Sequence, residues 1–168
     1  MFRPLRRTGT ILLIALLAAV PAAGARAATI TAPARANVLK PLVFTSKQNL
    51  DFGTVLLGAS GTSTVSLSMA GVLSCGAGLT CSGVARPAIF NVQGSNGQVV
   101  RITAVASDLT NSTDGSKLRF TPIAPASVTL TNSGSPGKDF NLGGSIAIPS
   151  TTTDGTYTGN IVVTAEYQ

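Results

Sequence analysis

The strongest constraint on the fold is a two-residue alternation of apolar and polar side chains near the end of the sequence. One face of residues 156–168 is formed by every second residue: Tyr157, Gly159, Ile161, Val163, Ala165 and Tyr167. The opposite face is polar except at Val162. A period of two is typical of a β-strand with one buried face. We therefore predict one long strand over residues 156–168.

Shorter runs of the same character fill the rest of the chain. We predict strands over residues 42–46, 63–69, 89–93, 99–105, 118–121, 128–131 and 140–148. Residues typical of turns separate them, and Asn96 with Gly97 predicts a hairpin between the third and fourth of these strands. No window of a dozen residues has helical spacing. The fold class is therefore all-β, and at this length a β-sandwich is favoured over a barrel.

The first residues have the features of an export signal. Arg3, Arg6 and Arg7 precede an apolar run over residues 11–20, and the small residues Ala25 and Ala27 follow. This order predicts a secretory signal peptide over residues 1–27, cleaved between Ala27 and Ala28. The apolar run is about half of the roughly 20 residues that span a bilayer, so no membrane span is expected in the mature chain. We expect a secreted bacterial protein that passes through the periplasm.

Loss of the leader changes the charge of the chain. Four of the 12 basic residues lie in residues 1–27, which leaves eight against six acidic residues and a net charge of +2. The remaining basic residues are scattered and are not interleaved with Trp or Tyr. This pattern does not support nucleic-acid binding. The mature chain is long enough for one domain with a hydrophobic core, over residues 39–168.

The sequence contains two cysteines, Cys75 and Cys81. In an oxidising compartment this pair predicts one small disulfide loop. Closing so short a loop contributes about 2 kcal/mol by the chain-entropy relation. A metal site is not expected, because the sequence contains no histidine to complete one.

Catalytic chemistry has few candidate residues in this sequence. There is no histidine and a single glutamate, and the five aspartates lie mostly in turn-like contexts, where side-chain capping explains them. The serines lack a base that could activate them as nucleophiles. We therefore expect no enzyme activity and no cofactor.

The segment after the predicted cleavage site also alternates. Its apolar face is formed by Ala28, Ile30, Ala32, Ala34, Ala36 and Val38. Pro33 removes a backbone donor, which is typical of an edge strand or of a strand that is not paired within its own sheet. Two interpretations stay open: residues 28–38 are the first strand or a disordered end of a self-complete sandwich, or they are a strand donated to another molecule.

Three stretches carry a resemblance to a known group of proteins. They are residues 50–55, in which Leu50, Phe52 and Gly53 form a core motif; residues 155–159; and the closing residues 162–168. Together with the alternating start, they make the chain resemble an exported bacterial family of unknown function, similar to spore coat protein U and to the subunits of archaic chaperone/usher pili. The resemblance covers essentially the mature chain, with its specific motifs at the two ends.

The resemblance implies an immunoglobulin-like β-sandwich that lacks one strand and accepts it from a chaperone and then from the next subunit. Residues 28–38 would be the donor strand. The groove edge would be formed by Gly155, Tyr157, Gly159, Ile161, Val163, Ala165 and Tyr167. The implied partners are a periplasmic chaperone, an outer-membrane usher and like subunits of a homopolymer. Two features depart from the pattern: the donor face is mostly alanine, and the two cysteines lie close together.

The expected function is that of an exported structural subunit of a pilus or coat at the bacterial cell surface, assembled by donor-strand exchange. A rival from another class is a monomeric secreted or periplasmic β-sandwich that binds a ligand such as a surface glycan. The sequence leaves both open, because closure of the groove depends on the three-dimensional fold.

Overall fold

The computed structural model describes residues 24, 26–58 and 61–168. Most of the predicted signal peptide lies outside the described residues, as do residues 59 and 60. The chain divides into two compact units, Met1–Ala36 and Asn37–Gln168. The described residues of the first unit form neither helix nor strand, and all thirteen strands belong to the second.

The strands of the second unit cover most of its length. Their bounds are β1 (Val43–Gln48), β2 (Thr54–Leu56), β3 (Thr62–Leu67), β4 (Leu73–Cys75), β5 (Thr80–Ser82), β6 (Ala88–Gln93), β7 (Val99–Val105), β8 (Ser107–Asn111), β9 (Lys117–Ile123), β10 (Ser127–Thr129), β11 (Lys138–Pro149), β12 (Tyr157–Thr158) and β13 (Val162–Tyr167).

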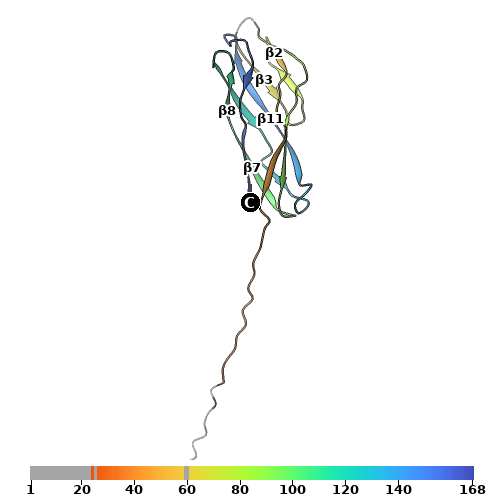
Figure 1. Ribbon diagram of the computed structural model, residues 1–168, viewed down its shortest axis with the longest axis vertical. Helices are drawn as coiled ribbons and strands as arrows, with labels where there is room; N and C mark the ends of the chain where they lie inside the picture. The colour runs from red at the N-terminus through yellow and green to blue at the C-terminus, as the bar shows by residue number, and fades with distance from the viewer. Residues whose placement is uncertain (1–23, 25, 59–60) are drawn as a thin grey trace, which may run out of the picture. The chain divides into compact units, whose positions relative to one another are not determined.

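The strands form a β-sandwich in which every pairing is antiparallel (Figure 1). The largest sheet has the order β1-β6-β11-β9-β8-β12, with β3 added to β11 and β4 added to β3. It curls because β11 pairs with β6 along its first half and with β3 along its second. A second sheet has the order β10-β7-β13, and β2 with β5 forms a separate two-stranded ribbon. The all-β prediction is confirmed.

The core lies between the sheets in two adjoining clusters. Phe52, Phe120 and Leu142 are in the larger cluster, and Val92 and Val100 are in the smaller. Partly buried Phe90, Ala124 and Val163 pack against both clusters, so the apolar interior is continuous. The buried positions alternate along the strands, as the period-two pattern requires.

The predicted hairpin at Asn96 and Gly97 is wrong, although the turn itself forms. β6 is paired with β1 on one edge and with β11 on the other, so it has no edge left for β7. The turn instead contacts the end of β10: the N–H of Gly97 donates to the carbonyl of Leu130 at 2.8 Å. The chain thus crosses from one sheet to the other at a sequence that is typical of a tight hairpin.

The long closing strand is also interrupted. β12 pairs with β8 in the large sheet, and β13 pairs with β7 in the other sheet. The chain changes sheets at residues 159–161, where Gly159 lies against β8: a Cβ there would meet the carbonyl oxygen of Asp108 at 2.5 Å. Tyr157, Ile161 and Val163 are half-buried on either side of the break, whereas Gly159 is exposed. The alternation of residue types runs through the break, so the sequence pattern does not reveal it.

Residues 28–38 form no strand in this structure. The interpretation in which they are the first strand of the chain's own sandwich therefore does not match the fold. Their assignment as a donor strand stays a prediction.

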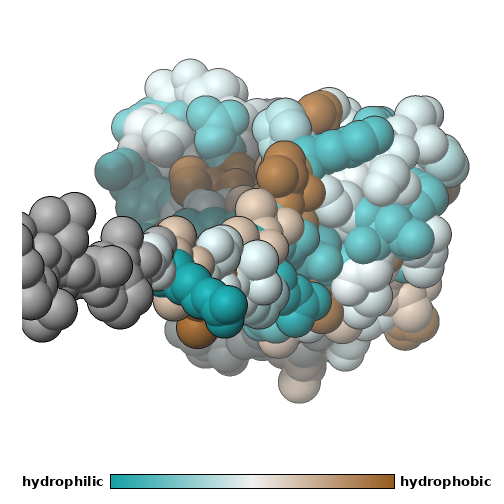
Figure 2. Space-filling view, turned by 90° about the horizontal axis from the view of Figure 1, so that it is seen from below, coloured by the Kyte–Doolittle hydropathy of each residue, from teal (hydrophilic) through white to brown (hydrophobic). Residues whose placement is uncertain are grey.

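One end of the domain has a largely polar or neutral surface (Figure 2). In the end-on view of Figure 2, hydrophobic residues form small separate patches among hydrophilic ones. Among the described residues, no helix is long and apolar enough to cross a membrane.

Candidate functional site

The site is built from two strands that each have one neighbour. Within the described residues, β1 pairs with β6 and β13 pairs with β7, and neither has a partner strand on its other edge. The N–H of Gln168 donates to the carbonyl of Val99. Because an antiparallel strand alternates the direction of its amides, the N–H groups of Thr164 and Glu166 also face β7, and those of Val163 and Ala165 face away from it.

The two free edges meet at one end. The hydroxyl of Tyr167 donates to the carbonyl oxygen of Lys40 at 2.7 Å and accepts from the N–H of Ser95 at 2.8 Å. The ring fills the space above Gly94, where a Cβ would meet the hydroxyl at 2.2 Å. Tyr167 therefore joins the end of β13 to the segment that leads into β1.

Farther along, a groove of about 1170 Å³ lies between the end of β1 with the segment that follows it and the segment that precedes β13. One wall is formed by residues 46 and 48–57, which run from β1 to β2, and the other by residues 152–161 around β12. β2 lies at the end of the domain away from the C-terminus (Figure 1). The groove is thus bounded by backbone that is only partly used by strand pairing.

The floor of the groove is apolar and is the surface of the larger core cluster. It is formed by Ala88, Phe90, Leu109, Leu118, Phe120, Ile146 and Ile148. Several of these side chains are already buried by their neighbours: Phe120 is 1% exposed and Ile148 4%. The floor is therefore a closely packed apolar surface.

The Leu50, Phe52 and Gly53 motif lies in the first wall. Phe52 is buried and packs edge-on against Phe120, with ring centroids 6.2 Å apart. Gly53 has a φ of +74°, and a Cβ there would meet the carbonyl oxygen of Ser82 at 2.6 Å. The carboxylate of Asp51 accepts from the N–H of Gly53, which fixes the turn into β2. The structure thus places this motif, which the sequence identified only as core, at the groove.

The second wall is fixed by a glycine and a tyrosine. Gly155 has a φ of +138° and lies against buried Asn111, whose amide donates to the carbonyl of Asp154 at 3.0 Å. The hydroxyl of Tyr157 contacts Ser116 Oγ at 2.9 Å and donates to the carbonyl of Thr153 at 2.8 Å. The wall is therefore attached to the turn between β8 and β9.

Electrostatics strengthen this attachment. The backbone N–H of Ser116 donates to Asp114 at 2.9 Å and lowers the pKa of that carboxyl, with the hydroxyls of Ser116 and Thr153 adding to the effect.

The lining of the groove carries two charged residues, Asp51 and Asp154, and no basic one. The groove is thus apolar in its floor and weakly acidic in its walls.

The residues predicted as a groove edge divide into two sets. Gly155, Tyr157, Gly159 and Ile161 line the groove. Val163, Ala165 and Tyr167 continue along the free edge of β13, and their side chains pack against the core clusters. Sequence reasoning missed the wall formed by Val55, Leu56 and Leu57, although this apolar run after Gly53 is a signal for a short strand.

The predicted disulfide between Cys75 and Cys81 is present, with 6.2 Å between their Cα atoms. It does not lie within one hairpin, because β4 pairs with β3 and β5 pairs with β2. Among the described residues, no group of three or more His, Cys, Asp or Glu side chains is arranged to hold a metal ion.

Comparison with known proteins gives a family for this fold. Residues 42–167 match the family model described as "Domain of unknown function (DUF4402)". The chain belongs to the DUF4402 family. The match spans β1 to the last residue of β13, so the groove walls and the free strand edges all lie within the DUF4402 domain. No curated protein and no solved structure matches the chain.

Proposed function

We propose that this DUF4402 chain is an exported structural subunit that assembles when residues 28–38 of one copy enter the groove of another. The observation that carries the proposal is the groove with an apolar floor between residues 46–57 and residues 152–161, next to the free edges of β1 and β13. Exposed strand edges accept an added strand through backbone hydrogen bonds, and pockets select its alternate side chains. The role is structural rather than catalytic.

The length and composition of residues 28–38 suit a strand added to this sandwich. An extended segment of 11 residues spans about 36 Å at roughly 3.3 Å per residue, close to the length of β11, which has 12 residues and contributes Ile146 and Ile148 to the groove floor. Its apolar face is mostly alanine. Ile30 and Val38 are its large members, and burial of each contributes roughly 1.5 to 3 kcal/mol.

Charge also favours this occupant. The single charged residue of the segment is Arg35, and the charged residues of the groove lining are Asp51 and Asp154. Opposite charges steer association and disfavour wrong partners more than they raise affinity. The donor and the groove are thus complementary in the sign of their charges.

The resemblance to spore coat protein U and to archaic pilin subunits supplies the setting of the proposal. In that setting a periplasmic chaperone first supplies the missing strand, an outer-membrane usher exchanges it, and the product is a homopolymer on the bacterial cell surface. The signal-like features of residues 1–27 support export.

A pair of variants tests the proposal on the chain from residue 28 onward. Ile30→Asp places a charge on the apolar face of the donor, and Thr31→Asp places the same charge on the opposite face. We expect the unchanged chain and Thr31→Asp to form SDS-resistant multimers that collapse on boiling, and Ile30→Asp to stay monomeric. A monomeric unchanged chain, or equal assembly of the two variants, would contradict the proposal and favour the monomeric binding module.

A further inference from the structure

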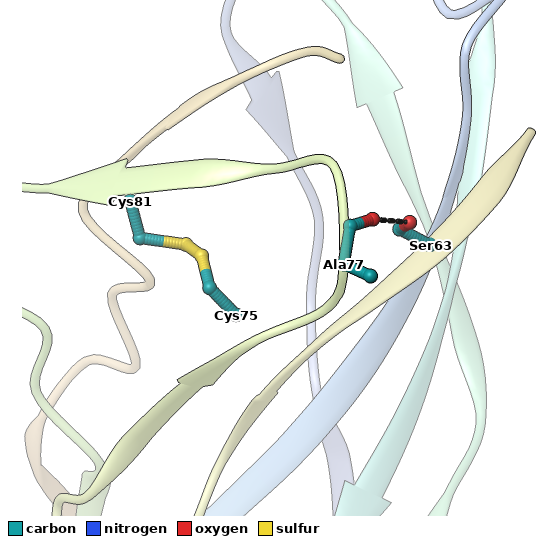
Figure 3. Close-up of a disulfide and its surroundings, with 4 residues drawn as sticks. All are labelled: Ser63, Cys75, Ala77 and Cys81. Carbon is teal, nitrogen blue, oxygen red and sulfur yellow. Dashed lines mark hydrogen bonds between the residues drawn. A yellow bond between two sulfur atoms is a disulfide. The ribbon is translucent and has the colours of Figure 1, made fainter. Parts of the chain in front are cut away.

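The disulfide connects two parts of the fold that share no strand pairing. Cys75 ends β4, which belongs to the large sheet through β3 and β11. Cys81 lies in the middle of β5, whose partner is β2. Figure 3 shows the bond crossing between these strands. The disulfide is therefore a covalent link from the large sheet to the β2–β5 ribbon.

The β2–β5 ribbon forms part of a groove wall. Thr54, Val55 and Leu56, which make up β2, all line the groove. The ribbon has two strands of three residues each, and within the described residues it pairs with no further strand. A two-stranded ribbon is marginally stable on its own in water. The wall therefore depends on what holds the ribbon to the sandwich.

Val55 and Cys81 of the ribbon pack against the larger core cluster, and the turn between β4 and β5 supplies further contacts. The N–H of Gly76 donates to the carbonyl of Thr64 at 2.9 Å, and the hydroxyl of Ser63 donates to the carbonyl of Ala77 (Figure 3). Gly58, after β2, lies so close to Gly78 that a Cβ would meet its carbonyl oxygen at 1.8 Å. These contacts join the turn to β3 and to the end of the ribbon. The disulfide, together with strand pairing, connects β2 to β11 through β5, β4 and β3.

We propose that the Cys75–Cys81 disulfide positions the β2 wall of the groove, so that capture of a strand requires oxidised cysteines. The proposal rests on the function proposed above and adds a redox requirement to it. Without the link, the ribbon opens locally more often. An incoming strand must then order the wall as it binds, which lowers its affinity.

The first experiment measures the wall itself, without any added strand. Hydrogen exchange followed by mass spectrometry compares the Ile30→Asp chain with the same chain carrying Cys75→Ser and Cys81→Ser. We expect exchange in residues 54–56 and 80–82 to rise at least about tenfold, with little change in β11. Equal exchange in the two proteins would overturn the proposal.

The second experiment measures strand capture. A synthetic peptide of residues 28–38 is titrated onto the Ile30→Asp chain, whose own donor is impaired. We expect loss of the disulfide to weaken peptide binding at least about tenfold. Reduction by a dithiol must have the same effect: it breaks the S–S bond, gives two thiols, and oxidises the reductant to its own disulfide. Faster exchange with unchanged peptide affinity would also overturn the proposal.

A matched control separates the wall from general stability. Val92→Ala removes buried volume from the smaller core cluster, away from the ribbon. It lowers the melting temperature but must leave exchange in residues 54–56 and peptide affinity close to those of the parent. If the oxidised parent fails to bind the peptide at all, the proposed function is wrong, while the exchange experiment still decides whether the disulfide holds the wall.

Discussion

The hydroxyl of Tyr167 donates a hydrogen bond of 2.7 Å to the carbonyl oxygen of Lys40, 127 positions earlier in the chain. This bond joins the last residue of β13 to the segment that precedes β1. It closes one end of the gap between two strand edges that have no other partner in the described structure. The groove lies farther from this bond, between residues 46 and 48–57 on one side and residues 152–161 on the other.

Removal of the Tyr167 hydroxyl tests this closure. Tyr167→Phe keeps the ring but loses its bonds to Lys40 and Ser95. We expect the free energy of unfolding to fall by about 1 to 3 kcal/mol, since each partly buried bond contributes roughly 0.5 to 1.5 kcal/mol. Urea denaturation measures the change. The neighbouring exposed position supplies a control, Glu166→Gln, which should change stability by less than about 0.5 kcal/mol.

Gly155 tests the second wall of the groove. In Gly155→Ala, the alanine would have to adopt a φ of +138°, and its Cβ would lie 2.7 Å from the amide oxygen of Asn111. We expect a loss of about 2 to 4 kcal/mol in thermal or urea unfolding. Gly97→Ala has a φ of +73° with open space around it, so it should lose only about 1 kcal/mol. Equal losses in the two variants would show that the Asn111 contact is unimportant.

Asp139 gives the stability a defined dependence on pH. Its hydrogen bond from Lys47, at 2.8 Å, lowers the pKa of the carboxyl below its ordinary value of 3.8, and a bond from Asn91 adds to this. A lowered pKa in the folded state means that the stabilisation is present above the unfolded pKa and is lost as pH falls through the folded one. The stability difference between the unchanged chain and Asp139→Asn should therefore shrink between about pH 5 and about pH 2 in urea denaturation. A constant difference would contradict this assignment.

Two groove residues separate folding from strand capture. Phe52 is 8% exposed and packs on Phe120, so Phe52→Ala should lower the free energy of unfolding by about 3 to 5 kcal/mol. Leu56 also lines the groove but is 67% exposed. Leu56→Ser should change stability by less than about 0.5 kcal/mol and still weaken binding of the peptide of residues 28–38. Unchanged peptide binding in Leu56→Ser would exclude β2 from the contact surface.

The local strand content could be predicted from the sequence because alternation is a local property. The expected strand over residues 99–105 coincides with β7, and the inward positions Tyr157, Ile161 and Val163 are all half-buried. The disulfide could be predicted because two cysteines allow only one pairing. In each case the information lies within a few residues of the chain.

The pairing of strands could not be predicted in the same way. Asn96 and Gly97 form the expected turn, yet β6 is paired with β1 and β11, whose residues lie up to about 50 positions away. Residues 159–161 interrupt the closing strand although the alternation runs through them, because a period of two reports the buried face and not the neighbouring strand. The groove follows from these distant pairings, so its walls could only partly be predicted.

The most direct test is residue-specific amide exchange along β13 in the labelled Ile30→Asp chain, with and without the peptide of residues 28–38. The N–H groups of Val163 and Ala165 face away from β7, whereas those of Thr164 and Glu166 face it. We predict that the inserted peptide pairs with the free edge of β13, which continues from the groove wall at residue 161, so that Val163 and Ala165 become protected and the other two amides change little. Unchanged exchange at Val163 and Ala165 under saturating peptide would contradict assembly by strand insertion.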